Sequence, residues 1–598
     1  MATYPLLVNK QIAKPATNRK MNAMTEFALQ PALPDDIGRQ GLFSGFAPGT
    51  VTLPKGFRVS EKFLPLPVDV ILEKDVAVKM RDGVTIYTDV LRPATNERVP
   101  VIVAWSPYGK SRGNAPQYDD LFRMLGMDTS VLSGLQKFEG PDPAYWCARG
   151  YAICHPDPRG TYNSDGNARW WNRLEGQDFH DLVEWCGERA WSSGKVGASG
   201  NSYLTVSQWF VASERPSHLA AIAPWEGMSD IYRDLVMRGG IPDYAFAETL
   251  RYAYIGKNQR EDLILDAQDH PLMDALWEER APDFSRIDVP AYVVASYSNS
   301  IHTPGTFRGW REMASTRKWL RIHSTMEWPD YYVEEHQADL LRFFDRYLKD
   351  VDNGWEYTPT VRYTLHDLEG NDRVNLTATQ FPPATAVTAR YYLDAKSGSL
   401  VAQPPAAARA DYDATSKDGN IQFSLGVDSA TAFVGYPRLR LYAEAEGADD
   451  MDIFVLLQKL DRDGNALEQI TVPNKSPQMQ AMTREGASIL NYKGSNGRLR
   501  ASMRHLDEKK TTDDVPVHTF DRVEKLAPGQ IVALDFDLFP MGLLLYPGQQ
   551  FRLTVGGYNI LGGAMPGTDN LTPDNKGRHV IHTGGSNASF LQIGTQPG

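Results

Sequence analysis

The chain has few cysteines and no long apolar run, and each absence excludes a class of protein. Its three cysteines, Cys147, Cys154 and Cys186, are an odd number without the spacing of metal ligands, so no disulfide framework and no metal site are predicted. No stretch approaches the roughly 18 consecutive apolar residues of a membrane-spanning helix. We therefore do not expect a protein that crosses a membrane or depends on disulfides.

The sequence also lacks an excess of basic residues. Its net charge at pH 7 is −12 and its isoelectric point is about 5.6, whereas a nucleic-acid-binding surface requires clustered positive charge. The N-terminus has no basic region before an apolar core, and no nucleotide-binding motif is present. We expect a cytoplasmic protein that acts on a small molecule without nucleic acid, membrane or cofactor. Homo-oligomerisation is left open.

The length of 598 residues exceeds what one hydrophobic core usually covers, so more than one domain is expected. Apolar runs such as Val99–Trp105 and Leu219–Ala223 alternate with amphipathic helical segments such as Glu175–Arg189. This alternation predicts an α/β fold with a mainly parallel sheet. After Gly354 the helical pattern stops. Short alternating runs punctuated by glycine and proline then predict an all-β sandwich of jelly-roll type.

These patterns divide the chain into four segments. They are an N-terminal arm (1–70), an α/β domain (71–227 and 286–352), a helical cap (228–285) and a C-terminal β-sandwich (353–598). Because the cap is inserted between strands, we expect it to cover the carboxyl ends of the sheet, where ligands of α/β proteins bind.

The turn at Gly200-Asn201-Ser202 is the first candidate for chemistry. A short strand, Lys195–Ala198, precedes it, and a helix is predicted to begin near Tyr203. A serine on such a sharp turn is exposed beside backbone N–H groups, which suits a nucleophile next to an oxyanion site. The Gly-x-Ser-x-Gly pattern is incomplete, because Leu204 replaces the second glycine. In a competing frame Ser199 lies too close to the strand, and an ordinary turn rich in small residues is the alternative.

Several motifs occur in the order seen in one known family. The chain from about residue 74 onward resembles the CocE/NonD α/β-hydrolases, which include cocaine esterase and the X-prolyl dipeptidyl aminopeptidases. The resemblance implies an α/β-hydrolase domain, a helical cap and a C-terminal jelly roll. It rests on Met80-Arg81-Asp82-Gly83, Pro107-Tyr108-Gly109-Lys110, Asp157-Pro158-Arg159-Gly160, Ser164-Asp165-Gly166, the segment 191–197, Gly200–Leu204 with Gln208-Trp209, and the segment 435–441.

The resemblance implies roles for three residues around the turn. Ser202 matches the family nucleophile, and Tyr108 matches the tyrosine whose hydroxyl contributes to the oxyanion hole. The backbone N–H of Tyr203 would be the second oxyanion donor. A donor of this kind is typically worth about 3 kcal/mol of the activation barrier.

The other two members of a serine triad depart from the family pattern. Asn299 stands where the family has an aspartate, and Glu327 stands where it has the histidine. One arrangement exchanges acid and base, with His302 as the base and Glu327 orienting it, because geometry rather than chain order defines a triad. A second arrangement pairs His323 with Glu226. In a third, the triad is incomplete.

Two classes of function follow from these residues. The first is a serine hydrolase that cleaves an ester, lactone or amide of a small organic substrate through an acyl-enzyme at Ser202. The second is a family member with an altered triad that performs non-hydrolytic acid–base chemistry such as elimination or cyclisation, acyl transfer, or binding alone. The substitutions at Asn299 and Glu327 favour the second class.

Overall fold

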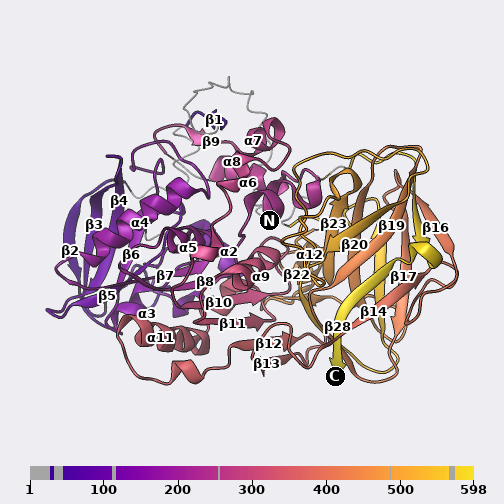
Figure 1. The fold of residues 1–598 in the computed structure, drawn as a ribbon. Coiled ribbons are helices and arrows are strands. Elements are labelled where there is room, and N and C mark those ends of the chain that lie inside the picture. The colour runs from indigo at the N-terminus through magenta and orange to yellow at the C-terminus, as the bar shows by residue number, and fades with distance from the viewer. Residues whose placement is uncertain are drawn as a thin grey trace.

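The computed structural model describes residues 27–32, 45–110, 116–253, 256–484, 486–564, 571 and 573–598. A large mixed sheet with its helices forms one half of the molecule, and a β-sandwich forms the other (Figure 1). Short helices of the cap segment lie along the junction between these two halves. The predicted fold class, an α/β-hydrolase domain with a helical cap followed by an all-β domain, is confirmed.

The α/β domain is built on an eleven-stranded sheet with the order β13-β12-β11-β10-β8-β7-β5-β6-β4-β3-β2. The strands from β6 to β12 pair in parallel, as expected for apolar runs buried on both faces. The bounds are β2 (Gly49–Leu53), β3 (Val70–Lys79), β4 (Thr85–Pro93), β5 (Val99–Val103), β6 (Ala152–Asp157), β7 (Ser192–Asn201), β8 (Leu219–Trp225), β10 (Ala291–Ser296), β11 (Lys318–His323), β12 (Val361–Leu365) and β13 (Arg373–Ala378).

Helices cover both faces of this sheet. On one face α4 packs against α5, and on the other the end of α11 lies under β7, where a Cβ on Gly197 would meet Phe344 and Leu348. The bounds are α2 (Pro116–Met124), η1 (Thr129–Val131), α3 (Pro143–Cys147), α4 (Arg173–Gly187), α5 (Tyr203–Glu214), α9 (Thr303–Glu312), α10 (Glu327–Tyr331), α11 (Glu334–Leu348) and η5 (Trp355–Tyr357).

Two boundaries predicted from the sequence are wrong. The sheet does not end at residue 352, because β12 pairs in parallel with β11 and antiparallel with β13, so it continues to Ala378. Helices do not stop after Gly354 either, since α12 (Pro477–Arg484) lies within the C-terminal half. At the other end β2, inside the predicted arm, extends the sheet by pairing with β3.

The cap segment consists of short helices held together by buried charges. Arg280 is fully buried, and it contacts the Glu261 carboxylate at 2.5 Å and the Asp266 carboxylate at 3.1 Å. One short strand, β9, pairs with β1, although no strand was predicted here. The bounds are β1 (Leu29–Gln30), η2 (Tyr232–Val236), η3 (Arg238–Gly240), α6 (Ala245–Ala253), β9 (Arg260–Glu261), α7 (Leu263–Asp269), α8 (Ala275–Glu278) and η4 (Phe284–Arg286).

The C-terminal half is a thirteen-stranded antiparallel-rich assembly, with β21 and β22 as a separate pair. Its strands are β14 (Val387–Asp394), β15 (Ser399–Val401), β16 (Ala408–Asp413), β17 (Asn420–Gly426), β18 (Thr431–Gly435), β19 (Arg438–Glu446), β20 (Asp452–Leu460), β21 (Gln469–Ile470), β22 (Asn491–Tyr492), β23 (Ser495–Arg500), β24 (Val532–Asp537), β25 (Met541–Leu545), β26 (Gln550–Gly556), β27 (Arg578–Thr583) and β28 (Phe590–Pro597), with η6 (Ala501–Met503) and η7 (Gly585–Asn587) as turns. Among the residues described, no helix combines the length and apolar character that a bilayer crossing requires.

Candidate active site

Ser202 sits on a sharp turn between β7 and α5, at the carboxyl end of the sheet. Its backbone is strained, with φ of 56° and ψ of −116°, a combination that L-residues rarely adopt. Its N–H donates to the backbone oxygen of Glu226 at 2.6 Å, which ties the turn to the end of β8. This geometry matches the sequence prediction of a strand, a sharp turn and a helix beginning at Tyr203.

The structure explains why Leu204 can stand in place of the second glycine of the Gly-x-Ser-x-Gly pattern. Gly200 has φ of 137°, and a Cβ there would lie 2.3 Å from Leu204 Cδ2 and 2.8 Å from the Glu139 oxygen. The absence of a side chain at Gly200 is what gives Leu204 its space, so the second glycine of the pattern is not needed. Ser199 is buried, and its hydroxyl is 2.8 Å from the Tyr331 hydroxyl, which is a structural contact within the fold.

His302, Glu327 and Asn299 meet in one buried cluster. His302 lies at the start of α9, and its Nδ1 is 3.4 Å from Glu327 Oε1 and 2.9 Å from Asn299 Nδ2. The Asn299 amide also donates to Glu327 Oε2 at 2.7 Å. Its orientation is fixed, because Oδ1 accepts the N–H groups of Ile301 and His302 at 3.0 and 3.1 Å. The two residues that depart from the family pattern therefore touch each other and His302.

His323 and Glu226 also meet, in a second contact. His323 Nε2 is 2.6 Å from Glu226 Oε1, and the other Glu226 oxygen accepts the Ser296 hydroxyl at 2.9 Å. Burial lowers the pKa of His323 to about 4. Burial, with the Glu327 carboxylate nearby, raises the pKa of Glu226 well above its usual value. Burial therefore disfavours the charged form of both groups in this contact.

Glu139 is a site residue that the sequence analysis missed. It is buried with φ of 66°, and its backbone oxygen accepts the N–H of Asn201 at 3.1 Å. Its carboxyl group accepts the Trp328 indole N–H at 2.6 Å and is hydrogen-bonded to the Tyr108 hydroxyl. Burial, reinforced by Glu327, raises the pKa of Glu139 well above its usual value. A single glutamate in a loop carries no motif, so no sequence signal identifies it.

Tyr108 lies beside the turn, as the resemblance implies. Its ring packs edge-on against Phe138 and Tyr203, with centroid distances of 5.3 and 6.1 Å. Because Tyr203 directly follows Ser202, this packing holds the Tyr108 side chain next to the nucleophile turn. The oxyanion role of the Tyr108 hydroxyl and the Tyr203 N–H remains a prediction.

One cluster could also accommodate a cation. A ligand atom from each of Glu226, His302 and Glu327 lies within 4.8 Å of the others, and all three residues are buried. A cation bound there would require the Glu226 carboxyl to give up its proton.

A serine on a strained strand-to-helix turn at the carboxyl end of a parallel sheet is typical of a serine hydrolase of the α/β-hydrolase fold. The model of the X-Pro dipeptidyl-peptidase (S15 family) matches residues 82–262. That of the X-Pro dipeptidyl-peptidase C-terminal non-catalytic domain matches residues 353–592.

The solved structures place the chain in its family. A CocE/NonD family hydrolase from Staphylococcus aureus is 34% identical, with a TM-score of 0.81 over 88% of this chain and 94% of that one. The chain therefore belongs to the CocE/NonD hydrolases. Cocaine esterase from a Rhodococcus strain is 33% identical over 160 residues, which span 27% of this chain but only 24% of that protein. An archaeal aminopeptidase at 16% identity and a TM-score of 0.63 shares the fold over 91% of this chain and 98% of that one.

Proposed function

We propose that this serine hydrolase cleaves an ester bond of a small organic substrate, or a lactone or amide of similar size, through an acyl-enzyme at Ser202. The observation that supports it most is the pairing of the strained Ser202 turn with the buried His302–Glu327 contact at 3.4 Å. Strain of this kind persists at functional sites because the surrounding structure holds it in place.

His302 acts as the general base in this proposal. Its Nδ1 faces Glu327, which leaves Nε2 as the nitrogen available to Ser202. Ser202 Oγ attacks the carbonyl carbon while its proton passes to Nε2, and the same proton then goes to the departing alcohol. Water attacks the acyl-enzyme by the same route, regenerating the serine. Contacts of catalytic groups are often long before substrate binds, and the 3.4 Å distance fits that pattern.

Glu327 orients the base and stabilises the imidazolium that forms. The Asn299 amide supports this role, because it donates to Glu327 Oε2 and so fixes the carboxylate plane. Acid and base are thereby exchanged between the two loops relative to the family pattern. The Tyr108 hydroxyl and the Tyr203 N–H would hold the oxyanion of the tetrahedral intermediate.

A second candidate, non-hydrolytic acid–base chemistry, is favoured by one contact. Asn299 Nδ2 lies 2.9 Å from His302 Nδ1, a distance that also suits donation from the amide to an unprotonated Nδ1. In that tautomer Nε2 carries the proton and cannot accept one from Ser202. His302 would then serve as an acid, beside the neutral carboxyl groups of Glu139 and Glu226.

Labelling with a fluorophosphonate probe distinguishes the two candidates. We expect the wild-type protein to be labelled rapidly and Ser202→Ala not at all. Ser199→Ala is the matched control, because Ser199 lies three residues away, is buried and contacts Tyr331, so it should label like the wild type. An unlabelled wild type would rule out the serine nucleophile. Turnover of uncharged aryl esters, lost in Ser202→Ala and kept in Ser199→Ala, would support ester hydrolysis.

A further inference from the structure

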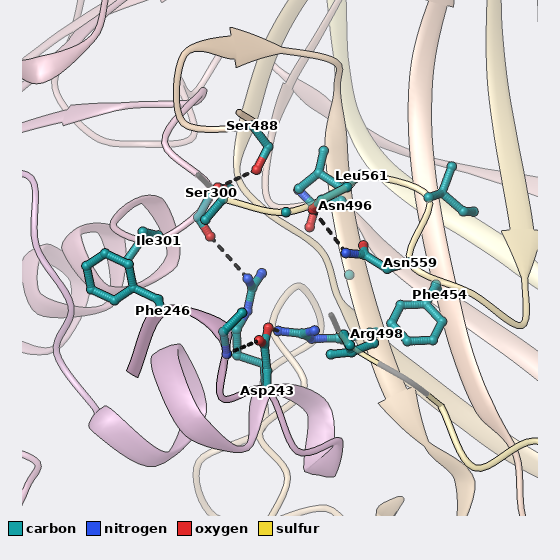
Figure 2. Close-up of a pocket in the computed structure, with 18 of the residues that line it drawn as sticks. Asp243, Phe246, Ser300, Ile301, Phe454, Ser488, Asn496, Arg498, Asn559 and Leu561 are labelled. Atoms are coloured by element: carbon teal, nitrogen blue, oxygen red, sulfur yellow. Dashed lines mark hydrogen bonds and ion pairs between the residues drawn. The ribbon is translucent and has the colours of Figure 1, made fainter. Parts of the chain in front are cut away.

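Two cavities meet at a pair of arginines where the α/β domain, the cap and the β-sandwich come together. The larger has a volume of about 560 Å³ and the smaller about 50 Å³, and both are lined by Arg238 of η3 and Arg498 of β23. Figure 2 shows the smaller cavity, with Phe246 and Ile301 on one side of Arg498 and Phe454 on the other. The residues that line these cavities do not include Ser202 or His302.

The carboxylates around the arginines are already committed. Asp243 is 2.6 Å from Arg498, and Asp234 is 2.8 Å from Arg308 and also accepts two backbone N–H groups. Arg238 is left with the backbone oxygen of Ser300 at 3.2 Å and the face of the Phe539 ring at 5.2 Å. Among the described residues no carboxylate lies within ion-pair distance of Arg238.

A partly buried guanidinium without an ion-pair partner is costly. Burial and the neighbouring positive charge of Arg498 lower the pKa of Arg238 to about 9. Arg498 itself has a side chain that is only 7% exposed, and its Nε is buried without a hydrogen-bond partner in the described part of the chain. The two guanidinium groups thus hold donors that no described residue uses, and guanidinium donors bind carboxylate oxygens well.

The larger cavity adds an apolar wall beside these donors. Its volume is within the range of small-molecule sites, and its aromatic lining favours a ligand with an apolar body. We propose that an organic carboxylate binds here, with its carboxylate on Arg238 and Arg498 and its aryl or alkyl body along the aromatic side chains. Those side chains are Trp277, Phe284, Phe307, Phe520 and Phe539.

This site is joined to the loop that positions His302. Arg238 holds the Ser300 carbonyl, and the Ser300 hydroxyl accepts a hydrogen bond from Ser488 of the β-sandwich at 2.8 Å. Ser300 is two residues before His302, so a ligand that shifts Arg238 acts on the segment that leads into α9. The bound carboxylate could come from the tail of a substrate or from a separate effector.

Binding is tested by isothermal titration calorimetry on the full-length protein with 4-phenylbutyrate, and with 4-phenylbutanol as the uncharged probe. We expect saturable binding of the acid and at least tenfold weaker binding of the alcohol. Arg238→Gln keeps a donor for the Ser300 carbonyl. It should bind the acid at least tenfold more weakly than the wild type and bind the alcohol equally well. Arg311→Gln is the matched control, because Arg311 lines the same cavity but faces Glu312 at 3.5 Å, and it should bind like the wild type.

Three results would overturn the proposal: no preference for acid over alcohol, equal affinity in Arg238→Gln and wild type, or loss of binding in Ser202→Ala. The last would mean that the acid occupies the nucleophile site. Because binding is measured without turnover, a failure of the serine chemistry leaves this test intact. If the carboxylate is the tail of a substrate, Arg238→Gln should raise the KM of esters that carry a carboxylate and leave the KM of uncharged esters unchanged. If the carboxylate is a separate effector, adding 4-phenylbutyrate should change the rate at which the wild type hydrolyses uncharged esters and should have no effect on Arg238→Gln.

Discussion

His323 Nε2 lies 2.6 Å from Glu226 Oε1, and both side chains are almost completely buried. Burial lowers the pKa of His323 to about 4 and raises the pKa of Glu226 well above its usual value. Burial thus disfavours the charged form of both groups at this close contact. The backbone oxygen of Glu226 also accepts the Ser202 N–H, so the His323–Glu226 contact lies next to the residue that holds the Ser202 turn in place.

The first prediction separates the two histidines. A buried imidazole with a lowered pKa that lies against Glu226 is a poor base, so His323→Gln should keep kcat/KM within roughly tenfold of wild type on aryl esters. His302→Ala should lower kcat/KM by about 10³-fold, the scale of a lost general base. Glutamine at 323 is polar and of similar size to histidine, which limits structural damage. Full activity in His302→Ala with none in His323→Gln would reverse the assignment.

The second prediction concerns stability and pH. The unfolded chain protonates His323 below pH 6.5, whereas the folded protein does so only near pH 4, so the unfolded state binds more protons in that window. The free energy of unfolding contributed by His323 should fall as pH drops from 6.5 to 4, by up to about 3 kcal/mol. Urea denaturation of wild type and His323→Gln measures this as a stability difference that changes with pH.

Other buried histidines do not affect the stability difference between wild type and His323→Gln. His518 and His579 have pKa values lowered to about 4 by burial as well, but both are present in wild type and variant, so their contributions cancel. Above pH 6.5 the difference between the two proteins should be constant. Parallel stability curves down to pH 4 would contradict a buried neutral His323.

The turn at Ser202 follows from a local motif, and the sequence allowed both the His302–Glu327 and the His323–Glu226 contact without deciding between them. The contacts it could not predict depend on burial. Whether Glu226 is charged, for example, depends on its burial and on four side chains at the end of β10, at the start of α9 and on α10. Glu139 was missed for the same reason, since its carboxyl acquires a role only when Trp328 and Tyr108 pack beside it.

The error at residue 352 has a different cause. Short alternating runs with turns between them look the same in a β-sandwich and at the edge of a mixed sheet. Only pairing distinguishes them, and β12 pairs with β11 through Leu320 and Val361. The next strand, β13, follows as an antiparallel edge. Pairing between strands that are far apart in the sequence cannot be predicted from the local alternation of apolar and polar residues.

The third prediction tests the exchange of acid and base. Asn299→Asp keeps the oxygen that accepts the backbone N–H groups but places a second carboxylate beside Glu327, where the amide now lies at 2.7 Å. The change removes the amide N–H that fixes Glu327 and sets two carboxylates against each other. We expect Asn299→Asp to lower kcat/KM by about tenfold at pH 7, because Glu327 no longer orients His302 in one position. An unchanged kcat/KM would mean that the Asn299 contact with Glu327 plays no part in catalysis.

The fourth prediction joins Tyr108 to Glu139. Glu139 is hydrogen-bonded to the Tyr108 hydroxyl, so its carboxyl group helps to hold that hydroxyl beside the Ser202 turn. Tyr108→Phe should lower kcat by about 10²-fold with KM little changed. Glu139→Leu should do the same, whereas Glu139→Gln retains both a donor and the oxygen that accepts from Trp328 and should stay near wild type. A Tyr108→Phe variant with unchanged kcat would remove Tyr108 from the oxyanion site.

The fifth prediction uses the strain at the nucleophile. Ser202 has φ of 56° and ψ of −116°, which glycine adopts far more easily than serine or alanine. Ser202→Gly and Ser202→Ala both remove the hydroxyl, but only glycine relieves the backbone. The strain released should exceed the entropy that glycine loses on folding, leaving Ser202→Gly about 1 kcal/mol more stable than Ser202→Ala. Thermal denaturation of the two inactive variants measures this difference directly. Equal stability of the alanine and glycine variants would show that a side chain at position 202 causes no backbone strain.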